Sequence, residues 1–235
     1  MQTLNPTTEE PTFACSDSWR TWWSDASIRS RVLDRFERLV ILCLFGFFSQ
    51  AFAVAIGTAI RFGQSVAISD LMLLFTETIM VVLVLFRRQA KNLSLSPTDW
   101  ALAFSATCLS LLARPFAGAP HSWSEFAALL TILGVSIQLI SKITLGRRFG
   151  VVAANRGICM SGPYRFVRHP IYMGYIFLHA GFVILNPHIW NFGVFALLYS
   201  VQIPRLLAEE RLLVQDSEYK AYTQKVQYRL IPGLF

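Results

Sequence analysis

Two long apolar segments, near residues 39–60 and 68–86, most restrict how this chain can fold. A helix needs roughly 20 apolar residues to cross a bilayer, and both segments reach that length. Backbone polar groups inside a bilayer must be paired within the segment itself, so such segments are helical. The chain of 235 residues is 54% hydrophobic and only 15% charged, unlike most soluble domains. The sequence therefore predicts an all-α, polytopic membrane helical bundle.

Further apolar segments follow, and each is less clear than the one before it. They lie near residues 100–113, 125–145, 171–185 and 189–207. A helix of about 15 residues, at ~1.5 Å per residue, is shorter than a hydrocarbon core of ~30 Å. Residues 171–185 and 189–207 therefore either cross with thinning or tilt, or form a re-entrant hairpin. We expect five to six transmembrane segments.

Basic residues are distributed unevenly around these segments. They are Arg20, Arg29, Arg31, Arg35 and Arg38 before the first span, Arg87, Arg88 and Lys91 after the second, and Lys142, Arg147, Arg148, Arg156, Arg165 and Arg168 after the fourth. The positive-inside rule then predicts cytoplasmic N- and C-termini, in a bacterial inner membrane or the endoplasmic reticulum. We attribute the net charge of +7 to this topology and to contact with anionic membrane lipids, not to nucleic acid.

Cysteine and histidine spacing gives no sign of a metal site. Cys15, Cys43, Cys108 and Cys159 form no C-x-x-C pair, and the four histidines lack the spacing of metal ligands. We expect small hydrophobic cysteines, no disulfide and no metal. His179, in an apolar segment, is expected to be a hydrogen-bonded interior residue. Trp19, Trp22 and Trp23 are expected to anchor the N-terminal segment at the membrane surface.

A polar, turn-rich stretch from Ser161 to Gly174 leads directly into an apolar helix. Gly162-Pro163 favours a turn, and Pro170 suits the first position of a helix. The helix start then presents unpaired N–H groups and the positive end of its dipole, which suits an anionic ligand group. The alternative is a juxtamembrane turn whose arginines bind lipid phosphates.

A second polar cluster lies at Pro204 to Glu210, where Arg205 and Glu209 share one helix face because they are four residues apart. Pro204 should kink the helix there and turn both side chains toward a cavity. The alternative is a surface ion pair, worth at most ~1 kcal/mol. Glu77 is a third candidate because an acid inside an apolar span is costly. A structural pairing and a substrate-site role remain equally open for Glu77.

From about Arg156 onward, four ordered patterns resemble the isoprenylcysteine carboxyl methyltransferase family of integral-membrane methyltransferases. They are Gly-Pro-Tyr at 162–164, Arg-His-Pro-x-Tyr-x-Gly at 168–174, Arg-x-x-x-Glu-Glu at 205–210, and Glu-Tyr-x-x-Tyr at 218–222. The wider relatives of that family include phospholipid N-methyltransferases and bacterial thiol methyltransferases. The acidic run after Arg205 is shorter than in the eukaryotic enzymes, and the N-terminal half shows no motif that aligns.

The resemblance implies transfer of a methyl group from S-adenosylmethionine to a lipophilic or prenylated substrate, with a carboxylate oxygen as the expected acceptor. The implied cofactor-binding residues are Arg156, Gly157, Ile158, Cys159, Tyr164, His169, Pro170, Ile171, Tyr172 and Glu209. Arg205 matches the arginine placed at the substrate, so Arg205 and Glu209 are the expected catalytic residues. Arg205 and Glu77 are the expected substrate-binding residues.

The expected organisation is a cytoplasmic or interfacial segment at 1–38, transmembrane helices at 39–145 and a methyltransferase region at 146–235. The tail from Ser217 to Phe235 is expected to fold over the site as a lid. A small lipid, quinone, terpenoid acid or thiol remains an alternative substrate. Two other functions also remain open: an NADPH-dependent membrane reductase of sterol-reductase architecture, and a non-catalytic lipid-binding protein.

Overall fold

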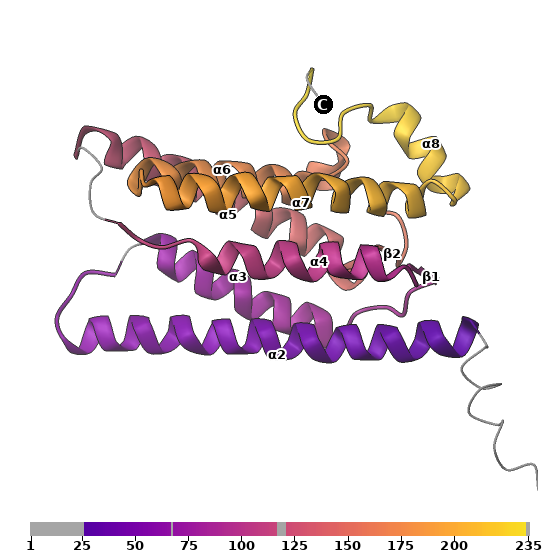
Figure 1. Cartoon of the computed structure of the whole chain (residues 1–235), viewed down its shortest axis with the longest axis horizontal. Coiled ribbons are helices and arrows are strands. Elements are labelled where there is room, and N and C mark those ends of the chain that lie inside the picture. Colours follow the sequence, from indigo (N-terminus) through magenta and orange to yellow (C-terminus); the bar gives the residue numbers. More distant parts are fainter. Residues whose placement is uncertain (1–25, 67, 117–120, 234–235) are drawn as a thin grey trace, which may run out of the picture.

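The computed structural model describes residues 26–66, 68–116 and 121–233, and the chain within these ranges is mostly helical (Figure 1). The long helices are α2 (Ala26–Arg61), α3 (Ile68–Leu85), α4 (Pro97–Leu109), α5 (Ser124–Leu145), α6 (Pro170–Leu185) and α7 (Ile189–Leu213), and a short helix α8 (Ser217–Lys225) follows. Short 3-10 turns lie at Ser110–Leu112, His121–Trp123, Gly146–Arg148 and Gly162–Arg165. Cys15, Trp19, Trp22, Trp23 and Phe235 lie outside the described residues.

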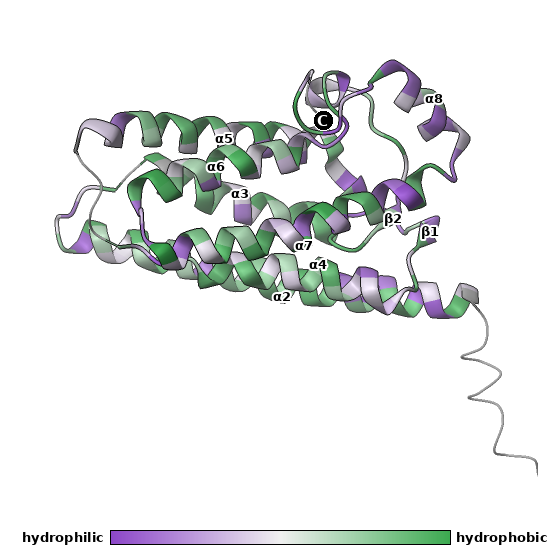
Figure 2. Ribbon diagram, turned by 45° about the horizontal axis from the view of Figure 1, so that its top comes forward, coloured by the Kyte–Doolittle hydropathy of each residue, from purple (hydrophilic) through white to green (hydrophobic). Residues whose placement is uncertain are grey.

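The six long helices run side by side along the longest axis of the molecule (Figure 1). Three of them, over Ser27–Arg61, Ser124–Arg148 and Ile189–Leu213, are long and apolar enough to cross a membrane, while Leu71–Leu85 and Pro170–Leu185 are shorter apolar helices. Hydrophobic residues cover the middle of the bundle, and hydrophilic residues gather toward α8 and the two strands (Figure 2). The predicted all-α polytopic membrane bundle is confirmed.

Most helix boundaries agree with the apolar segments of the sequence, and two helices extend beyond them. Helix α2 begins at Ala26, so the expected boundary at residue 38 lies inside it. Helix α7 continues through Pro204 to Leu213, beyond the expected end at residue 207. Both extensions are interrupted by charged residues, so their mean hydropathy is too low to mark them as part of a spanning segment.

The closest helix packing joins α5 to α6, and glycines make it possible. A Cβ atom at Gly134 would lie 2.5 Å from the backbone nitrogen of Leu178 and 2.7 Å from the carbonyl oxygen of Gly174. A Cβ atom at Gly181 would lie 2.6 Å from the carbonyl oxygen of Ala127. Small residues at helix crossings let backbones approach closely in membranes, where helices associate through packing.

The other large interfaces pair α2 with α3 and α4 with α7. Helices α6 and α7 are consecutive, but each packs mainly against a different partner. At the hydrophilic end of the bundle, strands β1 (Asn92–Leu93) and β2 (Ala154–Asn155) form an antiparallel pair. This pair ties the segment after α3 to the segment after α5.

Candidate active site

A cavity of about 470 Å³ extends from the polar motifs into the apolar interior of the bundle. Its walls come from α2 to α7, from the segment 148–159 and from α8. Nearly all site residues expected from the sequence line this cavity: Glu77, Arg156, Gly157, Ile158, Cys159, Tyr164, His169, Ile171, Tyr172, Arg205 and Glu209. Pro170 is the exception, because it is buried at the start of α6 without facing the cavity.

The Gly-Pro-Tyr motif forms a compact turn at the polar end of the cavity. Gly162 has φ +56°, a conformation that glycine adopts without strain, and the 3-10 turn follows it to Arg165. This turn buries Tyr164, whose carbonyl oxygen accepts a hydrogen bond of 2.6 Å from the Tyr222 hydroxyl on α8. Helix α6 begins at Pro170, directly after His169, as the sequence predicts.

The tail occupies part of the helix start that the sequence suggested for a ligand. The carbonyl oxygens of Tyr228 and Arg229 accept hydrogen bonds from the N–H groups of Arg168 and His169, at 3.0 and 2.9 Å. Pro170 has no N–H group. The first-turn amides of α6 without an intrahelical acceptor therefore belong to Ile171 and the residue after it, Tyr172.

Glu210 organises this part of the site, although the sequence analysis gave it no role. Its carboxylate contacts His169 Nε2 at 3.2 Å, Arg168 Nη1 at 3.0 Å and Arg229 Nε at 2.6 Å. The Tyr219 hydroxyl adds a donor at 3.4 Å. Arg168 and His169 are therefore paired with an acid of α7 and are not free to bind an anion. The only sequence signal for Glu210 is its place in the Glu-Glu pair.

The predicted lid agrees with these contacts for the described part of the tail. Tyr219 and Tyr222 of α8 line the cavity and are almost fully buried. Burial raises the pKa of Tyr164, Tyr219 and Tyr222, and nearby acidic side chains add to the rise for each of them. These three phenols therefore remain neutral at physiological pH.

Arg205, Tyr172 and Glu209 form a compact group where the polar end meets the apolar interior. The Tyr172 hydroxyl donates a hydrogen bond to Glu209 Oε2 at 3.2 Å. The Arg205 guanidinium lies 5.7 Å from the centre of the Tyr172 ring, and its Nη2 donates to the carbonyl oxygen of Val151 at 2.9 Å. Arg205 Nε is buried without a hydrogen-bond partner among the described residues. Among the described residues its Nη1 group makes no hydrogen bond, so the guanidinium retains a donor that can face a ligand in the cavity.

The deeper part of the cavity is largely apolar. Phe45, Phe48 and Phe52 of α2 form one wall, and Phe182 and Phe195 lie on α6 and α7. Two ionisable residues interrupt this surface: Glu77 of α3 and Lys142 of α5. His179 Nδ1 forms a hydrogen bond of 3.1 Å with the Tyr199 hydroxyl. The predicted interior hydrogen bond of His179 is therefore confirmed.

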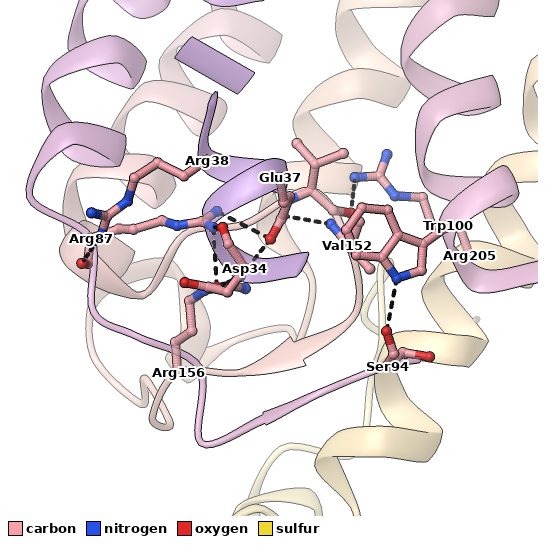
Figure 3. A network of polar contacts seen from close by, with 10 residues as sticks. Asp34, Glu37, Arg38, Arg87, Ser94, Trp100, Val152, Arg156 and Arg205 are labelled. Atoms are coloured by element: carbon pink, nitrogen blue, oxygen red, sulfur yellow. Dashed lines mark hydrogen bonds and ion pairs between the residues drawn. The ribbon is translucent and has the colours of Figure 1, made fainter. Parts of the chain in front are cut away.

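A buried ion-pair cluster beside the cavity joins the N-terminal helix to the segment after α5 (Figure 3). Asp34 and Glu37 of α2 contact Arg87 and Arg156 at 2.7 to 3.2 Å. The arginine side chains are at most 1% exposed. Both arginines, which the charge pattern places on the cytoplasmic side, therefore also form buried ion pairs within the bundle. Burial lowers the pKa of Arg87, and the carboxylate of Glu37 partly opposes this effect.

Comparisons with known proteins give a sequence-family match and a structural likeness. The sequence model of the phospholipid methyltransferase family matches residues 123–219. A structure of the eukaryotic intramembrane Ras methyltransferase, isoprenylcysteine carboxyl methyltransferase, solved without a monobody, shares 18% identity, with a TM-score of 0.43, over 93% of this chain and 90% of that one. No curated protein sequence matches the chain significantly. The family match over residues 123–219 supports the resemblance to methyltransferases that the motifs indicate.

Proposed function

We propose that this membrane methyltransferase uses S-adenosylmethionine and methylates a carboxylate oxygen of a lipophilic or prenylated substrate. The observation that carries the proposal is one continuous cavity with a polar end and an apolar interior. Its volume of about 470 Å³ falls in the range of small-molecule sites, roughly 300–1,000 Å³. Such a cavity suits a polar cofactor and the reactive end of an amphiphilic substrate together.

The residues at the polar end fit the chemical groups of this cofactor. The amides of the α6 start suit a carboxylate, and Glu209 can accept hydrogen bonds from an amine or hydroxyl group. Tyr164, Tyr219 and Tyr222 provide aromatic surface for a purine ring. S-adenosylmethionine supplies a methyl group on a positively charged sulfur atom.

Arg205 and the apolar interior of the cavity would bind and orient the substrate and exclude water in this reaction. The unpartnered Arg205 donor suits a substrate carboxylate, because guanidinium stays charged and forms a planar fork. Fixing the carboxylate near the cofactor contributes to rate through proximity and orientation. Exclusion of water by the apolar walls strengthens the electrostatic interactions of the site. Glu77, with Lys142, would contact a polar group farther along the substrate.

Binding measurements on detergent-purified protein test the cofactor directly. We expect S-adenosylmethionine and its demethylated product to bind in the micromolar range, roughly −8 kcal/mol, and NADPH not to bind. Isothermal titration and thermal shift assays measure both ligands. Binding of NADPH alone would favour the reductase, and binding of neither ligand by folded protein would favour a lipid-binding protein.

Variants separate the two halves of the site. We expect His169→Ala and Glu209→Ala to weaken cofactor binding at least tenfold, about 1.4 kcal/mol. Arg205→Ala should leave cofactor binding within twofold and abolish methyl transfer. Equal loss of cofactor affinity in all three variants would show that Arg205 belongs to the cofactor site.

The acceptor atom can be identified with a radiolabelled methyl group and a panel of lipophilic acids, thiols, phenols and amines. A methyl ester releases volatile methanol when it is treated with base, whereas a methylated thiol, phenol or amine does not. We expect base-labile label on an apolar carboxylic acid, and a prenyl-cysteine analogue is the first to test. Label that survives base would contradict the carboxylate acceptor but not the methyltransferase.

A further inference from the structure

The carboxylate of Glu37 is completely buried, and its two oxygens contact different sets of partners. Its Oε1 accepts hydrogen bonds from the N–H groups of Val151 and Val152, at 2.7 and 2.9 Å. Its Oε2 accepts a hydrogen bond of 2.7 Å from Arg156 Nη2 and lies 3.2 Å from Arg87 Nη1. One oxygen therefore holds the backbone turn before β2, and the other belongs to the ion-pair cluster.

The same turn holds Arg205. The carbonyl oxygen of Val151 accepts a hydrogen bond of 2.9 Å from Arg205 Nη2. This carbonyl and the N–H group of Val152 belong to one planar peptide unit, in which they point in opposite directions. A hydrogen bond that fixes the N–H group of Val152 toward Glu37 therefore also fixes the direction of the carbonyl toward Arg205 (Figure 3).

The contacts that Arg205 makes with the described residues leave its guanidinium dependent on this carbonyl. The Arg205 guanidinium lies 5.7 Å from the centre of the Tyr172 ring. This contact stabilises the positive charge of the guanidinium but does not fix the direction in which its N–H groups point. Arg205 Nε has no hydrogen-bond partner among the described residues, and the side chain lines the cavity. The Val151 carbonyl therefore sets the direction in which the remaining donors point.

We propose that Glu37 is a positioning residue for Arg205, acting through the peptide unit between Val151 and Val152. The proposal rests on the proposed function only in taking Arg205 as the substrate-facing arginine. Glu37 lies on α2, outside the matched region 123–219. A residue of the N-terminal half, which carries no recognisable motif, thus determines the geometry of the substrate site.

A purely structural role for Glu37 is the alternative, and Asp34 provides the matched control. Asp34 lies one turn earlier on α2 and pairs with the same two arginines, at 3.1 and 2.8 Å. Among the described residues it makes no hydrogen bond to Val151 or Val152. Asp34→Asn therefore weakens the ion-pair cluster while leaving the support of the turn in place.

Two Glu37 variants remove that support in different ways. In Glu37→Gln, either orientation of the amide places its NH₂ group against donors, namely two arginines or two backbone N–H groups. Glu37→Asp keeps the charge beside the arginines but is one methylene shorter. If one variant does not fold, the other still tests the proposal.

Chemical modification of Arg205 in folded, detergent-purified protein provides a measurement that needs no substrate. Phenylglyoxal reacts with accessible guanidinium groups, and mass spectrometry gives the rate at Arg205 relative to exposed Arg165. We expect Arg205 to react at least threefold faster in Glu37→Gln and Glu37→Asp, and unchanged in Asp34→Asn. An unchanged rate in both Glu37 variants, or an equal increase in Asp34→Asn, would overturn the proposal.

Kinetics with a confirmed lipophilic acid add a second measurement. We expect Glu37→Asp to raise the KM for that acid several-fold while binding of S-adenosylhomocysteine changes less than twofold. The same substitution should have no further effect in an Arg205→Lys background, because the two residues act in one pathway. Additive effects would contradict the proposal. Absence of cofactor binding would refute the proposed function and leave the modification result valid.

Discussion

The contact between α5 and α6 allows a quantitative test of the bundle, through Gly134→Ala. The new Cβ atom would lie 2.5 Å from the Leu178 nitrogen and 2.7 Å from the Gly174 oxygen. Atoms in contact normally lie at about 3.5–4.0 Å, so the helices must separate by roughly 1 Å. Both neighbouring atoms belong to the backbone and cannot rotate away. We therefore expect a packing cost near the upper end of the 1–3 kcal/mol range for overpacking.

Gly57→Ala in α2 is the matched control, because a Cβ atom at Gly57 meets nothing within 4 Å. Alanine is favoured over glycine in a helix by up to ~1 kcal/mol, and this gain is common to both variants. The difference between the two variants therefore isolates the packing cost, about 3 kcal/mol.

The free energy of unfolding can be measured by titration with SDS in mixed micelles, followed by circular dichroism. Size-exclusion chromatography checks that both variants fold. We expect Gly134→Ala to unfold at a lower SDS fraction and Gly57→Ala to equal or exceed the unchanged protein. Equal stability of the two variants would show that α5 and α6 do not approach as closely as described.

Three further predictions concern the tail, the topology and pH. Glu210→Gln should destabilise the protein by about 3 kcal/mol, because it removes the buried carboxylate that pairs with Arg168 and Arg229, and limited proteolysis should then cleave the tail faster. The topology can be tested with single cysteines, at exposed Ser161 or exposed Ile189, in a variant without native cysteines. An impermeant maleimide should label the cysteine at 161 only from the cytoplasmic side and the cysteine at 189 only from the opposite side. Labelling of both positions from one side would indicate a re-entrant hairpin. The hydrogen bond from Asn155 lowers the pKa of the Asp216 carboxyl, so its contribution to stability should be present at neutral pH and lost as the pH falls through that lowered value. The difference in thermal midpoint between the unchanged protein and Asp216→Ala should therefore shrink in acid.

Local sequence patterns predicted the features that depend on neighbouring residues in the chain. The starts of α3 and α6, at Ile68 and Pro170, follow from hydropathy and proline placement. The grouping of His169 with Glu209 around one cavity followed from the family resemblance. Such patterns indicate where a helix lies and which residues face a ligand.

The features that depend on tertiary packing could not be predicted in this way. Asp34 and Arg156 meet across 122 positions of the sequence, and no local pattern indicates that these two residues pair. The role of Glu210 depends on the tail folding back, which places Arg229 within 2.6 Å of its carboxylate. The pairing of α4 with α7 likewise depends on the arrangement of the whole bundle.

The position of Arg205 explains why this cavity needs both halves of the chain. Helix α7 carries Arg205 to the border between the polar end and the apolar interior, but the carbonyl that orients it belongs to Val151. That carbonyl is fixed in turn by Glu37 of α2, while Phe45 and Phe48 of the same helix line the apolar interior. One helix of the N-terminal half therefore supplies both the apolar wall and the support for the arginine. Under the proposed function, a substrate tail that packs against α2 would lie beside the residue that positions Arg205, so we expect the site to select the length of the tail and the position of the carboxylate together.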